Sequence, residues 1–324
     1  MISGMRGVHD MAPTPMTTKA AHSALRARCA SGDTNDQTRR VRTWAAFVGA
    51  IPSPPAGSLE LGPLRLNAYG LMIALGAIAA TMIAGRRMEG AGIGSREDAT
   101  QIAMIAVPAG VVGGRLYHVA TDWERFADDP LRIVQIWRGG LGIYGGMALG
   151  VVVGLVVARR RGLGILATLT AVTPGLPVAQ AIGRWGNWFN QELYGRATTL
   201  PWGLEIDARH APDGAAPGTL YHPTFLYESL GCLVLAALLV VVDRRARLAS
   251  GRLFAAYVAG YGVLRFFVEG LRIDPAKAAG GLRLNQWVSI VLVAAALAVL
   301  ARRDARLTRS PDGDPCAGSP TPAG

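Results

Sequence analysis

The fold of this chain is decided by residues 162–183, GLGILATLTAVTPGLPVAQAIG, which contain no charged side chain. A helix of about 20 apolar residues spans a bilayer, because about 30 Å of hydrocarbon is crossed at about 1.5 Å per residue. This run is therefore long enough to cross a membrane once. Six further apolar runs of similar length lie at residues 66–84, 99–121, 139–158, 223–242, 253–271 and 284–301. The sequence predicts an all-α polytopic membrane protein with seven transmembrane helices.

The composition supports this class of protein. Of the 324 residues, 51% are hydrophobic and only 17% are charged, which is too apolar for an ordinary soluble domain. The three cysteines have no framework spacing and the 41 glycines have no fixed period, which excludes a disulfide-stapled module and a collagen-like chain. Much of the net charge of +11 falls in short arginine clusters between apolar runs, as topology signals do. We therefore expect binding to a lipid bilayer and not to nucleic acid.

The basic residues also predict how the chain is oriented. The connections on one side of the expected bundle, together with the C-terminal tail, contain 14 lysines and arginines, and the opposite connections contain nine. Because basic loops stay in the cytoplasm, we expect the N-terminus outside and the C-terminus inside the cell. Residues 1–43 lack apolar periodicity, so we expect a disordered extension or one that precedes the true translation start. Residues 44–301 form the expected transmembrane domain, and residues 302–324 an expected disordered cytoplasmic tail.

The segment after the fourth apolar run is the richest in polar chemistry. Residues 183–196 read GRWGNWFNQELYGR, and we expect them to lie in an outer-face loop region between helices 4 and 5. Arg184 can present a planar fork of donors to a phosphate, and Asn187 and Asn190 can add neutral donors. Glu192 can orient an arginine or accept a proton. This composition suits an anion site, and equally an interfacial loop with a structural Arg–Glu pair.

Three apolar runs contain charged residues, which are functional candidates because charge at membrane depth is costly. These residues are Arg115, Glu228, Arg265 and Glu269. Tyr261, Arg265 and Glu269 are spaced i, i+4, i+8, which places them on one face of a helix. That stripe either belongs to a shared site with Glu228 or only locks helix packing. Arg115 is expected to complete a cationic ring with Arg184 and Arg265.

Three further residues open predicted helices near the same surface. Tyr69 lies at the start of the first helix, and Tyr144 lies within a glycine-rich opening of the third. His222 precedes Pro223, and because proline is tolerated in the first helical turn, we expect His222 at the N-cap position. A histidine at a helix N-terminus is more often structural than catalytic, so both roles stay open for His222.

The order and spacing of these motifs resemble the prolipoprotein diacylglyceryl transferase family over residues 51–301. The motifs are Tyr69-Gly70-Leu71-Met72, Gly113-Gly114-Arg115, Gly139-Gly140-Leu141, Gly183-Arg184-x-Gly186-Asn187-x-x-Asn190-x-Glu192-x-x-Gly195-Arg196, His222-Pro223-x-x-x-Tyr227-Glu228 and Tyr261-Gly262-x-x-Arg265-x-x-x-Glu269. The resemblance implies a seven-helix transferase of the bacterial plasma membrane. Such an enzyme takes the diacylglyceryl group from phosphatidylglycerol and attaches it by a thioether to the lipobox cysteine of a preprolipoprotein signal peptide. Glycerol phosphate is released.

The resemblance also implies roles for individual residues. Arg184 and Arg265 would bind the headgroup phosphate, and nearby carboxylates would orient these arginines. The expected catalytic residues are Arg184, Arg265, Tyr69, Tyr261, Glu192, Glu269 and Tyr144. The expected substrate-binding residues are Arg184, Asn187, Asn190, Gly195, Glu228, Arg115 and His222, with Gly195 acting through its backbone. No metal cluster and no nucleotide loop is visible in the sequence, so we expect no metal and no cofactor.

One position departs from the family pattern. Many members have a histidine, proposed as the base for the thiol, where this chain has Tyr144. A phenol with a pKa of about 10 is a poor base at neutral pH. Either the thiol proton goes to another group, or the thiol ionises in the positive field of the arginines, which is the hypothesis we favour. A Tyr144→Phe protein that keeps nearly full activity would agree with it.

Two other classes of function remain as alternatives. A polytopic transporter could use the buried charges as an ion path, but the two halves of the chain show no repeat of the kind that transporters often have. A non-enzymatic lipid-binding protein would have the same phosphate site and no transfer activity. Both alternatives predict that a lipobox peptide gains no mass from phosphatidylglycerol.

Overall fold

The computed structural model describes residues 49–61, 64–127, 129–135, 139–246 and 251–302. The expected N-terminal extension, residues 1–43, lies outside the described residues, as does the expected tail after Arg302. The chain divides into two compact units. Of the smaller unit, residues 49–51 and 199–203 are described, and the Ile51 N–H donates to the Gly203 carbonyl at 2.9 Å. The rest of the described chain forms the larger unit, which contains every helix named below.

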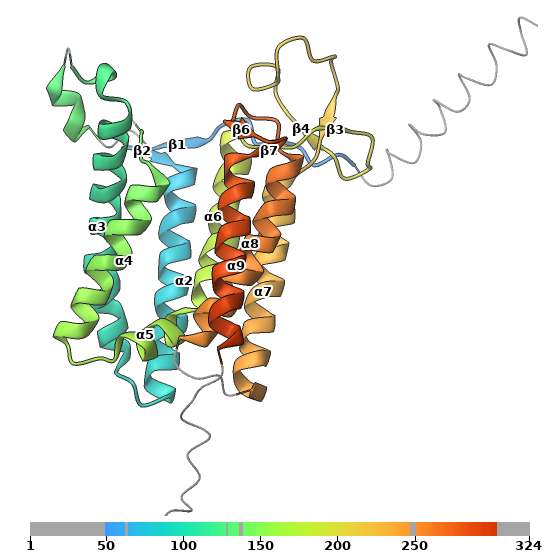
Figure 1. Ribbon diagram of the computed structural model, residues 1–324. Coiled ribbons are helices and arrows are strands. Elements are labelled where there is room, and N and C mark those ends of the chain that lie inside the picture. The colour runs from blue at the N-terminus through green and yellow to red at the C-terminus, as the bar shows by residue number, and fades with distance from the viewer. Residues whose placement is uncertain (1–48, 62–63, 128, 136–138, 247–250, 303–324) are drawn as a thin grey trace, which may run out of the picture. The chain divides into compact units, whose positions relative to one another are not determined.

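The larger unit is a bundle of α-helices (Figure 1). The helices are α2 (Ala68–Gly90), α3 (Arg96–Thr121), α4 (Ile143–Arg160), α5 (Ile165–Val172), α6 (Gly175–Asn190), α7 (Thr224–Ala246), α8 (Arg252–Leu271) and α9 (Leu284–Ala301). Five of them, α2, α3, α7, α8 and α9, are long and apolar enough to cross a membrane, and α5 with α6 makes a sixth span if the pair is counted as one. Large apolar side chains such as Met104, Phe267 and Val291 are exposed on these helices. An apolar outer surface is expected where lipid is the solvent.

The run that predicts the fold is not a single straight helix. Residues 162–183 were expected to form one span, but α5 and α6 are bent by 46° at a short break. Pro174 and Pro177 lie at the break and lack the N–H groups that a continuous helix needs there. The helix that follows the bend continues to Asn190, beyond the end of the apolar run.

The contacts between helices follow from small residues and from short connections. α3 packs along α4, α2 along α6, and α8 along α9. A Cβ atom on Gly113 would lie 2.4 Å from the Gly145 carbonyl oxygen, so only glycine allows α3 and α4 to approach this closely. α4 begins at Ile143, so Gly139 and Gly140 precede the helix, and both have positive φ. The expected helical run from residue 139 is therefore four residues too long at its start.

Short strands add to the helices, so the fold is mostly helical rather than all-α. The strands are β1 (Ser58–Leu61), β2 (Leu64–Asn67), β3 (Ala197–Thr198), β4 (Leu204–Glu205), β5 (Leu220–Tyr221), β6 (Ala278–Ala279) and β7 (Leu282–Arg283). β1 pairs with β2, β6 pairs with β7, and β3, β5 and β4 form a three-stranded sheet in that order, with all pairs antiparallel. These strands gather at one end of the helix bundle, which we call the strand end (Figure 1). The expected loop region between the fourth and fifth spans contains β3, β4 and β5.

With α5 and α6 taken as one bent span, successive spans run in alternating directions (Figure 1). The strand end therefore contains the first turns of α2, α4, α7 and α9 and the last turns of α3, α6 and α8. Local caps fix two of these ends. The Asn67 side chain caps the start of α2 by accepting a hydrogen bond from the Tyr69 N–H at 2.9 Å. Gln191 caps the end of α6 in the left-handed conformation, with φ of 51°. The polar residues that the sequence singled out thus meet at one end of the bundle.

Candidate functional site

A buried carboxylate collects two arginines from different helices. Glu228 lies in the second turn of α7, and its Oε1 atom is 2.9 Å from Arg184 Nη2. Its Oε2 atom is 3.2 Å from Arg265 Nη1. The Tyr261 hydroxyl donates to Oε1 at 2.9 Å. The structure therefore brings Arg184, Arg265, Tyr261 and Glu228 together, as the proposed shared site requires.

The stripe along α8 faces this cluster. Arg265 Nη2 lies 2.6 Å from Glu269 Oε2, one turn further along the helix. Tyr261 and Arg265 both contact Glu228, and Arg265 also pairs with Glu269, so all three residues of the stripe face the bundle interior. Glu228 of α7 contacts Tyr261 and Arg265, and Asn285 of α9 contacts Glu269. Contacts from two other helices to one stripe agree with a shared site better than with a pair that only locks helix packing.

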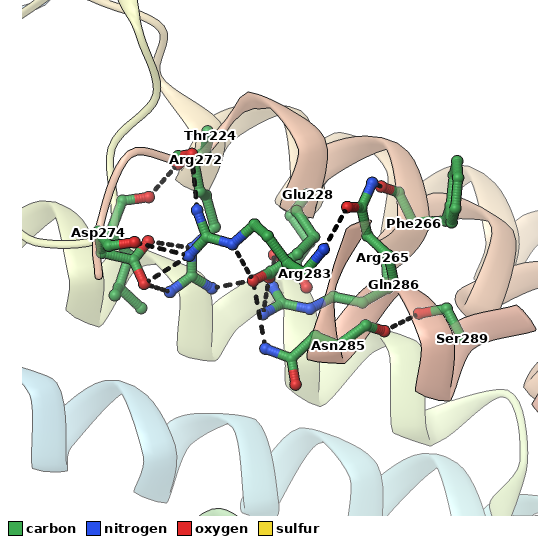
Figure 2. A network of polar contacts seen from close by, with 12 residues as sticks. Thr224, Glu228, Arg265, Phe266, Arg272, Asp274, Arg283, Asn285, Gln286 and Ser289 are labelled. Atoms are coloured by element: carbon green, nitrogen blue, oxygen red, sulfur yellow. Dashed lines mark hydrogen bonds and ion pairs between the residues drawn. The ribbon is translucent and has the colours of Figure 1, made fainter. Parts of the chain in front are cut away.

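Two arginines that the sequence analysis did not select complete the network. Arg272 binds Asp274 through two contacts, Nε to Oδ1 at 2.7 Å and Nη2 to Oδ2 at 2.9 Å. Arg283 lies between Asp274 Oδ2 and Glu269 Oε1, at 2.9 Å from each (Figure 2). Burial raises the pKa of the Asp274 carboxyl, but Arg272 and Arg283 more than offset this and hold that pKa below its ordinary value. The spacing of Arg272 three residues after Glu269 was the available signal for this extension.

The polar segment of α6 forms the other side of the site. Arg184 Nη1 donates to Asn187 Oδ1 at 3.2 Å, and Asn187 Nδ2 donates to Glu192 Oε1 at 2.9 Å. Asn190 Nδ2 also donates to Glu192 Oε1, at 3.2 Å. Residues 183–190 are helical, so the expected loop begins only after Asn190. The helix, rather than a loop, sets the direction of Arg184.

Tyr69 lies beside this segment. α2 and α6 approach so closely that a Cβ atom on Gly186 would lie 2.5 Å from Cδ2 of the Tyr69 ring. Tyr69 is hydrogen-bonded to Asn187 and lies within electrostatic range of Arg184. This predicted residue therefore joins the site.

The distribution of exposure within the site separates the charges. The Arg184 and Arg265 side chains are 18% and 16% exposed, whereas Glu228 and Glu269 are 2% and 0% exposed. The carboxylates therefore lie behind the guanidinium groups. Direct ion pairs join four arginines to three carboxylates, those of Glu228, Glu269 and Asp274, so this ion-paired network carries a formal charge of +1; Glu192, which reaches Arg184 only through Asn187, lies outside it. A buried network with surplus positive charge favours an anionic ligand.

Tyr144 contacts the network through a residue that the sequence analysis missed. Its hydroxyl donates to Asn285 Oδ1 at 2.8 Å, and Asn285 Nδ2 donates to Glu269 Oε1 at 3.2 Å. Asn285 follows Leu284 in the first turn of α9, within a run that had no charged residue. No spacing rule pointed to it, because its partners come from α4 and α8.

Arg115 has a different role from the one expected. Its guanidinium donates to the Ile133 carbonyl at 2.8 Å and to the Gly139 carbonyl at 2.7 Å. It also donates to the Gly140 and Arg132 carbonyls. Backbone carbonyls thus take the donors of Arg115, because the glycines before α4 turn their carbonyls toward it. These donors are therefore not directed into the expected cationic ring with Arg184 and Arg265, and Arg115 stabilises the segment that leads into α4.

Gly195 and His222 lie side by side at the border of the site. The Gly195 N–H donates to the His222 carbonyl at 2.9 Å, and a Cβ atom on Gly195 would lie 2.7 Å from His222 Cβ. The His222 ring nitrogen Nδ1 lies 3.1 Å from the Tyr227 hydroxyl. α7 begins at Thr224, so Pro223 takes the N-cap position. His222, which was expected there, lies one residue earlier. The contacts of His222 favour its structural role.

The cavities near these residues differ in size. One of about 10 Å³ touches Arg184, Asn187, Glu228 and Arg272, and it has room for about one water molecule. A ligand larger than a water molecule would therefore have to lie on the exposed side of the arginines. A polar cavity of about 300 Å³ borders Asn190 and Glu192. Within the described part of the chain, no three His, Cys, Asp or Glu side chains are grouped as metal ligands would be.

Apolar spans with a buried network of ion pairs at one end define a multi-pass membrane protein with a charged site at that end. A sequence model of the family described as prolipoprotein diacylglyceryl transferase matches residues 57–302. This chain belongs to the prolipoprotein diacylglyceryl transferase family.

Relatives of known name agree with this assignment. The chain is 50% identical over 253 residues to phosphatidylglycerol–prolipoprotein diacylglyceryl transferase 2 of Streptomyces coelicolor, which covers 77% of this chain and 80% of that protein. It is 49% identical over 259 residues to the phosphatidylglycerol–prolipoprotein diacylglyceryl transferase of Frankia alni, covering 78% and 68%. The enzyme of that name from Rhodococcus jostii is 45% identical over 292 residues, covering 84% and 81%. The protein is therefore a transferase of lipoprotein biosynthesis.

Proposed function

We propose that this transferase binds the phosphate of phosphatidylglycerol at the exposed sides of Arg184 and Arg265. The transferred diacylglyceryl group then passes to the cysteine thiol of a prolipoprotein lipobox. The observation that carries the proposal is that Glu228 holds one arginine on each carboxylate oxygen, while both guanidinium groups keep exposed surface. Arginine forks suit a phosphate because each can give two parallel donors.

The reaction needs positive charge at one place and a nucleophile at another. The cysteine sulfur forms a bond to a glycerol carbon, and the bond from that carbon to the phosphate oxygen breaks. The electron pair leaves on glycerol phosphate, and the thiol proton is released to solvent or to that phosphate. Guanidinium groups that are already in place stabilise the departing anion without reorganising.

The surrounding residues would hold the two arginines in this arrangement. Glu228 and Glu269 would fix Arg265, and Glu192 would act on Arg184 through Asn187. Tyr261 and Tyr69 would bond the headgroup or position the thiol. Asn190 would add a donor near Glu192. The thiol would ionise in the positive field of the network. Tyr144 would be a poor base for it, because a phenol is a weak base and this hydroxyl already donates a hydrogen bond to Asn285.

The apolar part of the substrate needs a dry environment. An apolar cavity of about 340 Å³ lies between α2, α3, α4, α5, α6 and α8, with Met88, Ile102, Leu155 and Phe254 in its lining. An acyl chain of phosphatidylglycerol would fit the chemistry of this cavity. The headgroup would then lie toward the strand end.

We place the enzyme in the bacterial plasma membrane with the strand end outside. The opposite end of the bundle has arginine clusters at residues 86–87, 159–161 and 244–245, which agrees with a cytoplasmic location. Counting α4 as a span and α5 with α6 as one gives the seven helices that the sequence predicts. Residues 44–301 would then be the transferase domain, with its N-terminus outside.

A transfer assay with arginine variants tests the site. Purified protein is incubated with phosphatidylglycerol and a lipobox peptide, and the mass gain of a diacylglyceryl group is measured. Arg184→Ala and Arg265→Ala should each lower the rate by roughly 10²–10³-fold, as the loss of an oxyanion donor does. Arg125→Ala is the matched control, because Arg125 is an exposed arginine in the short helix η1 (Trp123–Arg125) that follows α3.

The results separate the proposal from its alternatives. Loss of transfer in both site variants and not in the control supports the assigned roles. Full activity in either site variant would show that its arginine does not hold the phosphate. A wild-type protein that binds the lipid and transfers nothing would favour a non-enzymatic lipid-binding protein.

A further inference from the structure

Asn285 joins two parts of the site that belong to distant segments. It accepts from the Tyr144 hydroxyl of α4 and donates to Glu269 of α8. Glu269 in turn contacts Arg265, and Arg265 contacts Glu228. An unbroken chain of polar contacts therefore runs from α4 through α9 and α8 to α7.

The direction of each hydrogen bond in this chain is fixed by chemistry. An ionised Glu269 can only accept, so the Asn285 amide nitrogen must face it. The amide oxygen then faces Tyr144, whose hydroxyl must donate. The two partners thus determine the amide orientation, which would otherwise be ambiguous.

The contacts of Glu269 show what this orientation controls. Arg283 and Asn285 bind its Oε1 atom at 2.9 and 3.2 Å. Arg265 binds its Oε2 atom at 2.6 Å, and Arg272 lies 3.5 Å from the same oxygen. Asn285 is the neutral member of this set, so it directs one oxygen without adding charge. Rotation of the carboxylate away from it would also turn the oxygen that holds Arg265.

We propose that Asn285 is a positioning residue for the transfer reaction: it holds Glu269, and through it Arg265, in the productive orientation. Tyr144 acts one step further back by fixing the amide of Asn285. This inference rests on the proposed role of Arg265 as a phosphate-binding group. It gives Tyr144 a function that does not require the phenol to act as a base.

Substitution by aspartate supplies a readout that a purely structural role would not produce. Asn285→Asp keeps an acceptor for Tyr144 and places a second carboxylate beside Glu269. Asn285 contacts two titratable groups, Glu269 and Tyr144. The charged and titratable groups that contact these two are Arg265, Arg272 and Arg283 on Glu269 and Tyr117 on Tyr144, and Glu228 follows behind Arg265. The ionised aspartate cancels the surplus positive charge and competes for Arg265, and protonation removes both effects.

The experiment measures kcat and KM for the lipobox peptide on full-length protein in phosphatidylglycerol vesicles, from about pH 5.5 to about pH 8. For Asn285→Asp, the ratio of its kcat to the wild-type kcat should lie about tenfold below one at pH 8, where the aspartate is ionised, and should rise at lower pH as the aspartate takes up a proton. Asn285→Ala should lower kcat roughly tenfold with little change in KM, and Tyr144→Phe should lower it by less than about threefold. Asn67→Asp is the matched control, because it adds a carboxylate at the same end of the bundle while still capping α2.

Three outcomes would overturn the inference. An Asn285→Asp kcat within twofold of wild type at pH 8, where the aspartate is ionised, is the first, and an Asn285→Ala kcat within twofold of wild type is the second. The third is the same pH dependence in Asn67→Asp. If Asn285→Asp does not fold, the kcat of Asn285→Ala decides alone. An active Arg265→Ala protein would contradict the proposed function itself, whereas an inactive one together with normal Asn285 variants would contradict only this inference.

Discussion

Replacing Glu228 by glutamine tests the centre of the site. The change keeps the shape of the side chain and removes the charge that holds Arg184 and Arg265. Removing one partner of a buried ion pair costs about 3–5 kcal/mol, because the other charge stays buried without compensation. Here both arginines keep some exposed surface and can be partly hydrated, so we expect a loss at the lower end, about 3 kcal/mol. That corresponds to a fall in Tm of about 6–12 °C.

The effect on activity follows from the same contacts. Without the carboxylate, the two guanidinium groups repel one another and lose their common reference point. We expect transfer to fall roughly 10²–10³-fold, as it does when preorganised donors are lost. The assay is the transfer of a diacylglyceryl group to a lipobox peptide, measured by mass, alongside thermal unfolding in the same detergent.

Glu89→Gln provides the matched control for this substitution. Glu89 pairs with Arg96 at 2.6 Å, but its side chain is 53% exposed, so the same chemical change should cost only about 0–1 kcal/mol. Equal losses of stability in the two variants would refute the argument that the buried position of Glu228 is what matters. Normal transfer by a folded Glu228→Gln protein would refute its role in orienting the arginines.

Two further predictions concern the border of the site. Gly195→Ala should destabilise the protein by about 1–3 kcal/mol in thermal unfolding, because its Cβ would lie 2.7 Å from His222 Cβ; Gly183→Ala, which meets nothing within 4 Å, should not destabilise it. Asp274 has a pKa below its ordinary value in the folded protein, so its stabilisation is present above about pH 4 and is lost as the pH falls through the lowered pKa. Asp274→Asn should therefore lower Tm at pH 7, with a difference that disappears in acid; a constant difference would contradict the prediction.

The helices and the centre of the site could be predicted because their signals are local. Apolar runs predict five of the helices that are long enough to span a membrane, and a sixth if α5 and α6 are counted as one. The i, i+4, i+8 spacing gives the face of α8 that carries Tyr261, Arg265 and Glu269. Opposite charges in separate spans had to meet, since none can face lipid without great cost. Alternating helix directions then place them at one end.

The residues that were missed depend on contacts across the fold. Arg283 and Asn285 lie where α8 and α9 are connected, and nothing in their own neighbourhood indicates that Glu269 will lie beside them. Arg115 gave the opposite error, because its position in a span predicted the site while the carbonyls before α4 satisfied its donors. Pro174 and Pro177 indicated a break between α5 and α6, but the length of the apolar run alone predicted one straight helix.

The distribution of charge along the helices bears on the transporter alternative. At the strand end lies the network around Glu228, and at the opposite end Arg87 pairs with Asp243 at 2.6 Å. Between these ends the described helices contain uncharged stretches, such as residues 229–242 of α7 and 253–264 of α8. An ion path needs polar groups across the full thickness of the membrane, since each desolvated step must be compensated. A charged site confined to one end instead suits a reaction in which the lipid headgroup lies at the membrane surface and the acyl chains stay in the hydrocarbon.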